Sequence, residues 1–223
     1  YYLASPVNWL LILCPKKFII EFMTILIVLK TGLSGLSFSW YLKKHFGVKK
    51  FGVGFFGMFY ALSGYMAAYS WNIMWLDCIM LFPLILLGLE QLVKEKKGTL
   101  YCITLGLSIL SNYYISIMIC IFMVIYVIAQ MTLNPPKSFG EFMGTGLRFA
   151  FYSLLAGGLA AVVLLPEIYA LQVTASGDFD FPKTFSSYFS IFDMIARHIG
   201  NVGTEIGLDH WPNIYCGVAV LMF

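Results

Sequence analysis

The chain has 223 residues, of which 60% are hydrophobic and only 11% are charged, and its mean hydropathy is +0.84. A soluble domain carries about 25% charged residues, so this composition excludes a fully water-facing surface and indicates a protein that lies in lipid. The net charge of +3 comes from short clusters between apolar runs. Such clusters are typical of membrane topology signals and argue against nucleic-acid binding.

Apolar runs long enough to cross a bilayer as helices follow one another through most of the chain. Lipid offers no partners to unpaired backbone groups, so we expect helices and an all-α, polytopic membrane bundle forming a single domain. The expected six membrane helices occupy 18–165: residues 18–42, 51–70, 73–93, a two-helix hairpin within 99–133, and 146–165, ended by Pro166. Residues 1–17 and 166–213 are expected outside, and the apolar run 214–223 reads as a truncated helix, so we expect a fragment.

The basic residues test this layout, because cytoplasmic loops collect Lys and Arg. Alternate loops hold nine of them (Lys43, Lys44, Lys49, Lys50, Lys94, Lys96, Lys97, Lys137 and Arg148) against four in the other set (Lys16, Lys17, Lys183 and Arg197). The alternation requires that residues 99–133 cross twice, with a turn at Ser111-Asn112-Tyr113-Tyr114 and a short first helix. We therefore predict that the loops 43–50, 94–98 and 134–146 are cytoplasmic.

Small residues predict where helices approach one another closely. Ala61, Gly64 and Ala68 share one face of the expected 51–70 helix, and Gly157-Gly158 lies in the middle of the 146–165 helix. Both sets are interpreted as packing seams.

Lys30 lies in the middle of the first expected span, about 12 residues or roughly 18 Å from either interface. A lysine stem is too short to reach water from that depth, and a charge there costs at least about 2.5–3.5 kcal/mol. Lys30 must therefore face a partner inside the bundle. A structural ion pair and contact with an anionic substrate both satisfy this requirement.

Asp77 follows Trp71, Asn72 and Trp75 at the outer end of the third expected span. Tryptophan belongs at the interface, and an aspartate near a helix N-terminus is favoured by the helix dipole, so anchoring and capping explain these residues. Flat rings beside hydrogen-bonding groups also resemble a surface for a carbohydrate or a lipid headgroup. Both readings stay open.

Other polar residues lie on the same expected outer face. Asn112 and Tyr113 form the hairpin turn, Glu167 follows Pro166, and Arg197 belongs to a short amphipathic stretch with Asp193, which is expected to lie flat on the membrane. Asp178-Phe179-Asp180 has the form of a DxD pattern. No metal-ligand spacing, CxxC pair, Walker A, GxGxxG, GxSxG or HExxH pattern occurs, which excludes a P-loop pump and a soluble-type hydrolase site.

Several segments resemble one known family. Tyr1-Tyr2-Leu3-Ala4-Ser5-Pro6-Val7-Asn8, Tyr60-Ala61-Leu62-Ser63-Gly64-Tyr65, the run Tyr69-Ser70-Trp71-Asn72-Ile73-Met74-Trp75-Leu76-Asp77, Ser111-Asn112-Tyr113-Tyr114 and Pro212-Asn213-Ile214-Tyr215-Cys216-Gly217 are similar to the bacterial membrane protein YfhO family. The resemblance covers essentially the whole chain.

This resemblance implies a GT-C-like fold and a glycosyltransferase of the cell membrane. Such an enzyme takes a sugar from a polyprenyl-phosphate carrier, the donor substrate, and passes it to a cell-envelope polymer such as teichoic or lipoteichoic acid. The resemblance places the catalytic carboxylate in a first outer loop upstream of Tyr1, with Asp77 a secondary candidate. No cofactor is assigned, and a divalent cation is left open.

The residues expected to bind substrate are spread over the outer face, and we list them together: Lys30, Trp71, Asn72, Trp75, Asp77, Asn112, Tyr113, Glu167 and Arg197. Lys30 or Arg197 is expected to hold the phosphate. A transporter or flippase of a lipid-linked precursor is the main alternative, because it also needs buried charge and an outer vestibule. A non-catalytic envelope scaffold is a third reading.

Overall fold

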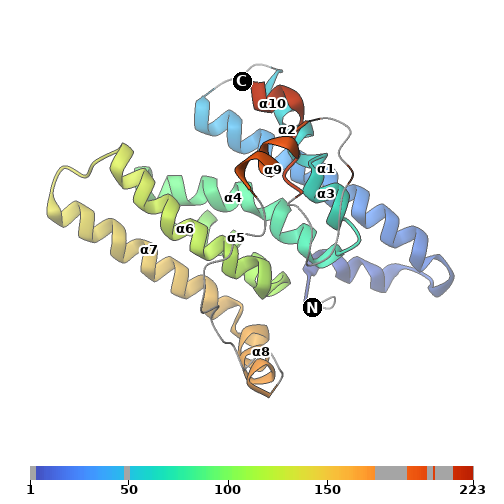
Figure 1. Cartoon of the computed structure of the whole chain (residues 1–223). Helices are drawn as coiled ribbons and strands as arrows, with labels where there is room; N and C mark the ends of the chain where they lie inside the picture. The colour runs from blue at the N-terminus through green and yellow to red at the C-terminus, as the bar shows by residue number, and fades with distance from the viewer. Residues whose placement is uncertain (1–3, 48–50, 174–189, 200–202, 204–212, 223) are drawn as a thin grey trace.

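The computed structural model is an all-α bundle, and Figure 1 shows its helices. The structure describes residues 4–47, 51–173, 190–199, 203 and 213–222. Within those residues the elements are, in order: η1 (Pro6–Leu13), η2 (Lys16–Phe18), α1 (Ile19–Phe46), α2 (Val53–Ala61), α3 (Gly64–Tyr69), α4 (Ile73–Glu95), α5 (Thr99–Ser111), α6 (Tyr113–Leu133), α7 (Phe139–Leu159), α8 (Ala161–Val173), α9 (Ile191–Ala196) and α10 (Val218–Met222).

Among the described residues, three helical segments are long and apolar enough to cross a membrane: Lys16–Phe46, Ile73–Glu95 and Tyr113–Leu133. A fourth candidate is the pair α7 and α8, which meet at an angle of 80°. The remaining expected spans consist of shorter helices, namely α2 with α3, and α5. The bundle therefore combines full-length helices with short ones.

The predicted hairpin within residues 99–133 is confirmed, including its short first helix. α5 has 13 residues and α6 has 21, and the helices are separated only by Asn112. The Asn112 side chain accepts a hydrogen bond from the Ile115 N–H at 3.0 Å, which caps α6. Ser108 and Ser116, on either side of the turn, are joined at 2.8 Å between their hydroxyl oxygens.

The expected continuous helix over 51–70 is wrong, because the chain breaks between Ala61 and Gly64. Ser63 is extended (φ −66°, ψ 158°), and a Ser-Gly pair is a common site of helix breaks. The Gly64 N–H donates to the Tyr215 carbonyl at 2.6 Å instead of to its own helix. The segment that contains Tyr215, far along the chain, thus provides an acceptor for the N–H group that the helix break leaves without one.

The expected end of the last helix at Pro166 is also wrong. α7 already begins at Phe139 and ends at Leu159, and the chain bends at Ala160. Pro166 lies inside α8, which continues to Val173. The bend follows Gly157-Gly158, where two residues of low helix propensity weaken the helix.

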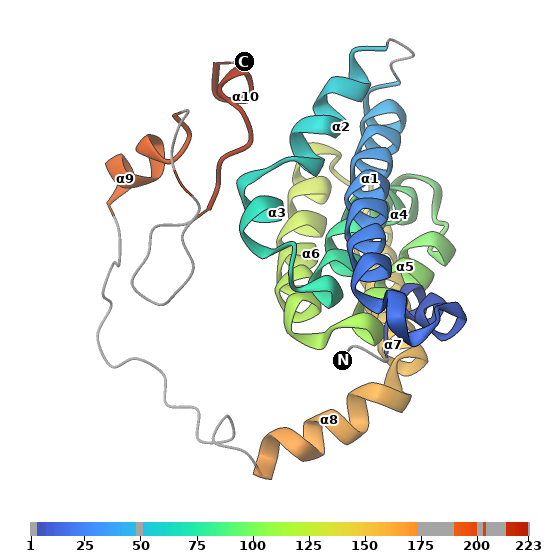
Figure 2. The ribbon, with the colours of Figure 1, turned by 90° about the vertical axis from the view of Figure 1, so that its right-hand side faces the viewer.

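α4 forms the centre of the bundle and packs against α1, α5, α6 and α7 (Figure 2). In its apolar window 67% of the residues are buried, against 17% in the helix that contains α1 and 33% in α6. Leu76, Ile85, Leu89 and Leu92 on α4 are completely buried. This central helix carries two buried carboxylates, Asp77 and Glu90, toward its two ends.

The closest helix approaches differ from those expected. A Cβ at Gly35 would lie 2.9 Å from the Gly57 carbonyl oxygen, so α1 and α2 touch through glycines. Gly88 of α4 similarly lies against the backbone of Tyr101 on α5. Ala61, Gly64 and Ala68 are buried but belong to two helices. The seam predicted at Gly157-Gly158 is wrong for the described part of the chain, because added Cβ atoms there would meet none of its atoms within 4 Å.

The lysine-rich loops gather at one end of the bundle. Lys44, in the last turn of α1, and Lys94, in the last turn of α4, line one cavity, while Lys94 and Lys137 line another. The ends of α1 and α4 and the α6–α7 connection therefore meet, as the alternation of basic loops predicts. We call this the lysine-rich end; Asn112 and the start of α4 lie at the opposite end.

The arrangement of ends is testable by labelling single cysteines in a variant without the five native ones. We expect Lys96→Cys and Lys137→Cys to react with an impermeant maleimide only from the cytoplasmic side. Because Trp71 is exposed, Trp71→Cys should react from the outside. Labelling of Lys96→Cys and Lys137→Cys from opposite sides would contradict this topology.

The glycine contact between α1 and α2 predicts a position-specific loss of stability. In Gly57→Ala the new methyl group would lie 2.6 Å from the Gly35 carbonyl oxygen and collide with the Ser39 hydroxyl. Gly54→Ala, on the same helix, places its methyl group in open space and gains up to about 1 kcal/mol of helix propensity. We expect a lower melting temperature in detergent for Gly57→Ala only, and equal melting temperatures would refute the close contact.

Candidate functional site

A buried polar cluster joins η1, α1 and α4. The Lys30 ammonium donates to Asp77 Oδ2 at 2.9 Å, to Asn8 Oδ1 at 2.8 Å and to the Ile73 carbonyl at 3.1 Å. Lys30 is 0% exposed, Asp77 1% and Asn8 6%. We call these three side chains and the Ile73 carbonyl the Lys30 cluster. The partner that the depth of Lys30 required is therefore Asp77.

Local structure explains how three distant segments meet here. Ser5 begins η1 and its hydroxyl accepts the Asn8 N–H at 3.3 Å, which turns Asn8 toward α1. Asp77 lies in the second turn of α4, and Ile73 is the first residue of that helix. The interpretation of Asp77 as a helix cap is wrong, because its carboxylate faces Lys30 across the helix interface.

The hydrogen bonds of the cluster limit what it can do chemically. An ammonium has three N–H donors, and Lys30 directs all three at protein acceptors. The second oxygen of Asp77, Oδ1, is buried and has no hydrogen-bond donor in the described part of the chain. It is thus the atom of the cluster that has capacity for a further hydrogen bond, such as one from a buried water molecule.

A series of aromatic rings runs beside this end of α4. Tyr65 and Tyr69 lie 5.0 Å apart between ring centroids, Tyr69 and Trp75 5.5 Å, and Trp75 and Tyr114 6.2 Å. We call these four residues, from α3, α4 and α6, the aromatic series. Trp71 is not part of it: it is 57% exposed, and its indole N–H donates to the Ala68 carbonyl at 3.0 Å.

The two asparagines of the predicted set are buried at the ends of helices. Asn72 precedes α4 and is 5% exposed, without a side-chain capping bond to that helix. Asn112 caps α6, and its carbonyl accepts from the Cys78 thiol at 3.7 Å, next to Asp77. Tyr113, the first residue of α6, is partly exposed. Helix capping and this backbone contact are sufficient to explain why Asn112 occupies the turn.

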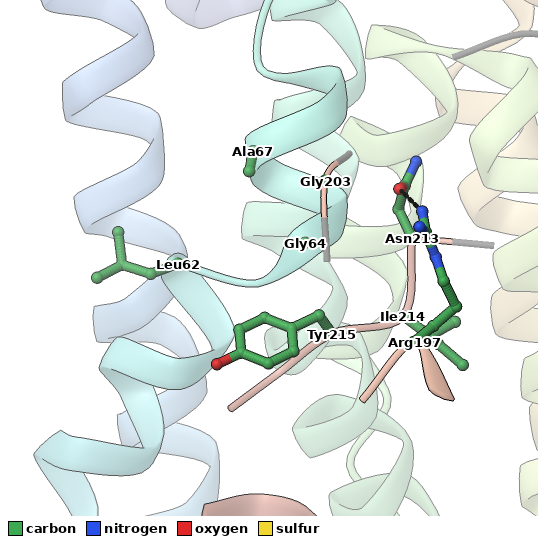
Figure 3. Close-up of a pocket in the computed structure, with 8 residues that line it drawn as sticks. All are labelled: Leu62, Gly64, Ala67, Arg197, Gly203, Asn213, Ile214 and Tyr215. Carbon is green, nitrogen blue, oxygen red and sulfur yellow. Dashed lines mark hydrogen bonds between the residues drawn. The ribbon is translucent and has the colours of Figure 1, made fainter. Parts of the chain in front are cut away.

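Glu167 lies on α8 and Arg197 follows α9, so both belong to other elements than those that form the Lys30 cluster. Glu167 is partly exposed on α8, and its Oε2 atom is buried without a hydrogen-bond partner among the described residues. Arg197 is 3% exposed, and its guanidinium donates to Asn213 Oδ1 at 2.9 Å. It lines a cavity of about 220 Å³ together with Leu62, Gly64, Ala67, Ile214 and Tyr215, which Figure 3 shows. We call this the Arg197 cavity.

The expected amphipathic stretch forms α9, with Ile191 and Phe192 strongly exposed. Asp193 belongs to a capping box: Ser190 donates its N–H and its hydroxyl to the carboxylate at 2.8 Å each. These bonds hold the pKa of Asp193 below its usual value. Asp178 and Asp180, the DxD pattern, lie outside the described residues.

A second buried cluster was not anticipated from the sequence. Glu90 Oε1 accepts from Tyr41 at 3.0 Å and Tyr126 at 2.7 Å and lies 2.6 Å from His45 Nδ1, while Oε2 accepts from Lys94 at 3.1 Å. We call these five residues the Glu90 cluster. The sequence feature that could have indicated this cluster is Glu90 itself, a carboxylate inside the apolar run of α4. No group of three His, Cys, Asp or Glu side chains within the described residues is arranged to hold a metal ion.

The Lys30 cluster predicts opposite effects for single and double substitutions. Lys30→Met leaves the Asp77 carboxylate buried and unpaired, which we expect to cost about 3–5 kcal/mol of stability. Lys30→Met combined with Asp77→Leu removes both charges and should recover most of the lost stability. Melting temperatures in detergent measure both, with exposed Lys16→Met as the control. A double variant no more stable than Lys30→Met would show that charge pairing is not what the cluster provides.

Comparison with known proteins places this arrangement in a family. No functionally curated protein and no solved structure matches the chain. The model of one family, described as bacterial membrane protein YfhO, matches residues 1–223. Because the match covers the whole chain, and the apolar helices agree with it, this chain belongs to the bacterial membrane protein YfhO family.

Proposed function

We propose that this chain forms part of a multi-pass glycosyltransferase of the bacterial cell membrane. It would move a sugar from a polyprenyl-phosphate carrier to a cell-envelope polymer such as teichoic or lipoteichoic acid. The observation that carries the proposal is the aromatic series beside the Lys30 cluster, at the end of the bundle opposite the lysine-rich loops. Membership in the YfhO family supports it.

The aromatic series suits a sugar because tyrosine and tryptophan combine a flat apolar face with a polar tip. Trp75 lies in the middle of the series, with Tyr69 on one side and Tyr114 on the other. It belongs to the same turn of α4 as Asp77, whose buried carboxylate is paired with Lys30. Trp75 is therefore the residue to which we assign sugar contact. Trp71, which is exposed, and Tyr113, which is partly exposed, stay predicted contacts, whereas Asn72 and Asn112 are buried at the ends of helices.

The phosphate of the carrier needs a cation, and Arg197 is the better candidate. All three N–H groups of Lys30 are engaged within its cluster, so a phosphate would have to displace a protein acceptor. Arg197 donates to Asn213 Oδ1, and it also lines a cavity whose other walls include Leu62, Ala67 and Ile214. A guanidinium beside apolar walls matches a phosphate attached to a hydrocarbon chain.

The deprotonation of the acceptor hydroxyl is not assigned to Asp77. A general base must come within hydrogen-bond reach of the proton it takes, and Asp77 is buried and paired with Lys30. We assign it a positioning role. That Glu167 contributes to the substrate surface stays a prediction.

A transporter or flippase of a lipid-linked precursor is the alternative. The buried Lys30–Asp77 pair favours it, because ion pairs inside membrane bundles also mark transport pathways. The two functions differ in one observable. A glycosyltransferase changes the acceptor covalently, whereas a flippase moves the lipid-linked sugar across the bilayer without covalent change.

We expect Trp75→Ala in the full-length protein to reduce sugar transfer about tenfold, which corresponds to about 1.4 kcal/mol in the transition state. The assay uses reconstituted membranes, a polyprenyl-phosphate sugar and an envelope-polymer acceptor. Trp40→Ala is the matched control, because Trp40 is an exposed tryptophan on α1. Transfer by Trp75→Ala at the rate of the control would remove the aromatic series from the site.

The same assay separates the roles of the charged residues. Arg197→Gln should raise the KM for the lipid-linked donor, and Arg197→Lys should partly restore it. If folded Lys30→Met/Asp77→Leu and Asp77→Asn transfer sugar at wild-type rates, the Lys30 cluster serves stability alone. Movement of the labelled donor across the bilayer without any covalent product would favour the flippase.

A further inference from the structure

A cavity at the lysine-rich end has no part in the proposed sugar transfer. It lies where the ends of α4 and α6 meet the start of α7, at the α6–α7 connection (Figure 1). Its volume is about 290 Å³, close to the lower limit of about 300 Å³ for small-ligand pockets. The polar residues around it are Lys94, Asn134, Lys137, Glu141 and Thr145. We call it the Lys137 cavity.

The charge around this cavity is positive. Lys94 and Lys137 line it directly, and the N-terminal end of the 21-residue helix α7 adds its partial positive charge. Glu90 offsets the charge of Lys94, with which it pairs at 3.1 Å. Glu141 accepts the Lys137 backbone N–H at 2.8 Å and remains a negative charge in the lining, so the excess of positive charge comes from Lys137, the end of α7 and Arg148. The cavity is therefore suited to an anion.

Arg148 is a third cation near the cavity, although it does not line it: it follows the lining residue Thr145 by one turn of α7. Glu141, Thr145 and Arg148 stand at i, i+4 and i+7, so they share one face of α7. The guanidinium bends toward the start of the helix, with Nη2 3.4 Å from the position of a Cβ on Gly144. Its Nη1 atom is buried and has no hydrogen-bond acceptor in the described part of the chain, where Arg148 also makes no ion pair.

The apolar surroundings indicate the source of the anion. Val93, Met131, Pro135 and Pro136 form the remaining walls. Leu133 is 76% exposed and Phe142 46%, so lipid tails can pack beside the opening. A free anion would gain nothing from these contacts, whereas a phospholipid would place its phosphate among the cations and its chains against the apolar residues.

We propose that the Lys137 cavity binds the headgroup of an anionic phospholipid from the leaflet at the lysine-rich end. The phosphodiester would accept hydrogen bonds from Lys137 and Arg148, with Lys94 contributing charge. This inference does not depend on sugar transfer, because it concerns the opposite end of the bundle. Lipid binding here would hold the α6–α7 connection against the end of α4.

The test measures the melting temperature of the purified protein in detergent as phosphatidylglycerol is added. Wild-type protein should be stabilised by phosphatidylglycerol and not by phosphatidylcholine. Lys137→Gln and Arg148→Gln should each weaken the apparent affinity by about fivefold, the factor given by about 1 kcal/mol per basic residue near a membrane surface. Lys43→Gln is the matched control, because Lys43 is an exposed lysine at the same end that lines no described cavity.

Each alternative has its own result. Equal affinity of wild type, Lys137→Gln and Arg148→Gln would overturn the proposal. Equal weakening by Lys43→Gln would mean general attraction to a basic surface, and stabilisation by inorganic phosphate as strong as by phosphatidylglycerol would mean a free anion as the ligand. Should Arg148→Gln fail to fold, Lys137→Gln alone decides between these results, because Lys137 is an exposed side chain.

Discussion

The arrangement of the bundle depends on the neutralisation of one charge that hydrocarbon cannot solvate. Lys30 has no access to water, so each of its N–H groups must find an acceptor in the protein. Asn8, Asp77 and the Ile73 carbonyl provide these acceptors from two other segments. The interaction thereby fixes where η1 folds back and how the start of α4 lies against α1.

A second polar contact between the same two helices gives this constraint its specificity. Thirteen residues along α4 from Asp77, Glu90 binds Tyr41 and His45 of α1. Apolar helix faces in lipid can slide past one another at little cost, whereas two polar contacts far apart are both satisfied in only one register. The buried groups of α1 and α4 thus select one packing, in addition to any stability they add.

The sequence predicted where the helices lie better than it predicted which residues contact one another. The Ser111-Asn112 break predicted the hairpin because an asparagine that caps a helix is a local signal. The depth of Lys30 predicted that it needs a partner, but not that Asn8 shares the task, because that contact depends on how η1 folds back. Glu90 was missed since its four partners come from three different helices. The interpretation of Gly157-Gly158 as a packing seam was wrong because the sequence alone does not distinguish a glycine pair that weakens a helix from one that packs against another helix.

The break between α2 and α3 has a consequence for how the protein is made. Gly64 obtains its backbone acceptor from Tyr215, which leaves the ribosome long after the first helices have entered the membrane. Until then, the amide of Gly64 must rely on water or on a temporary partner. The early helices therefore assemble before this hydrogen bond can form, and the later arrival of the Tyr215 segment completes it.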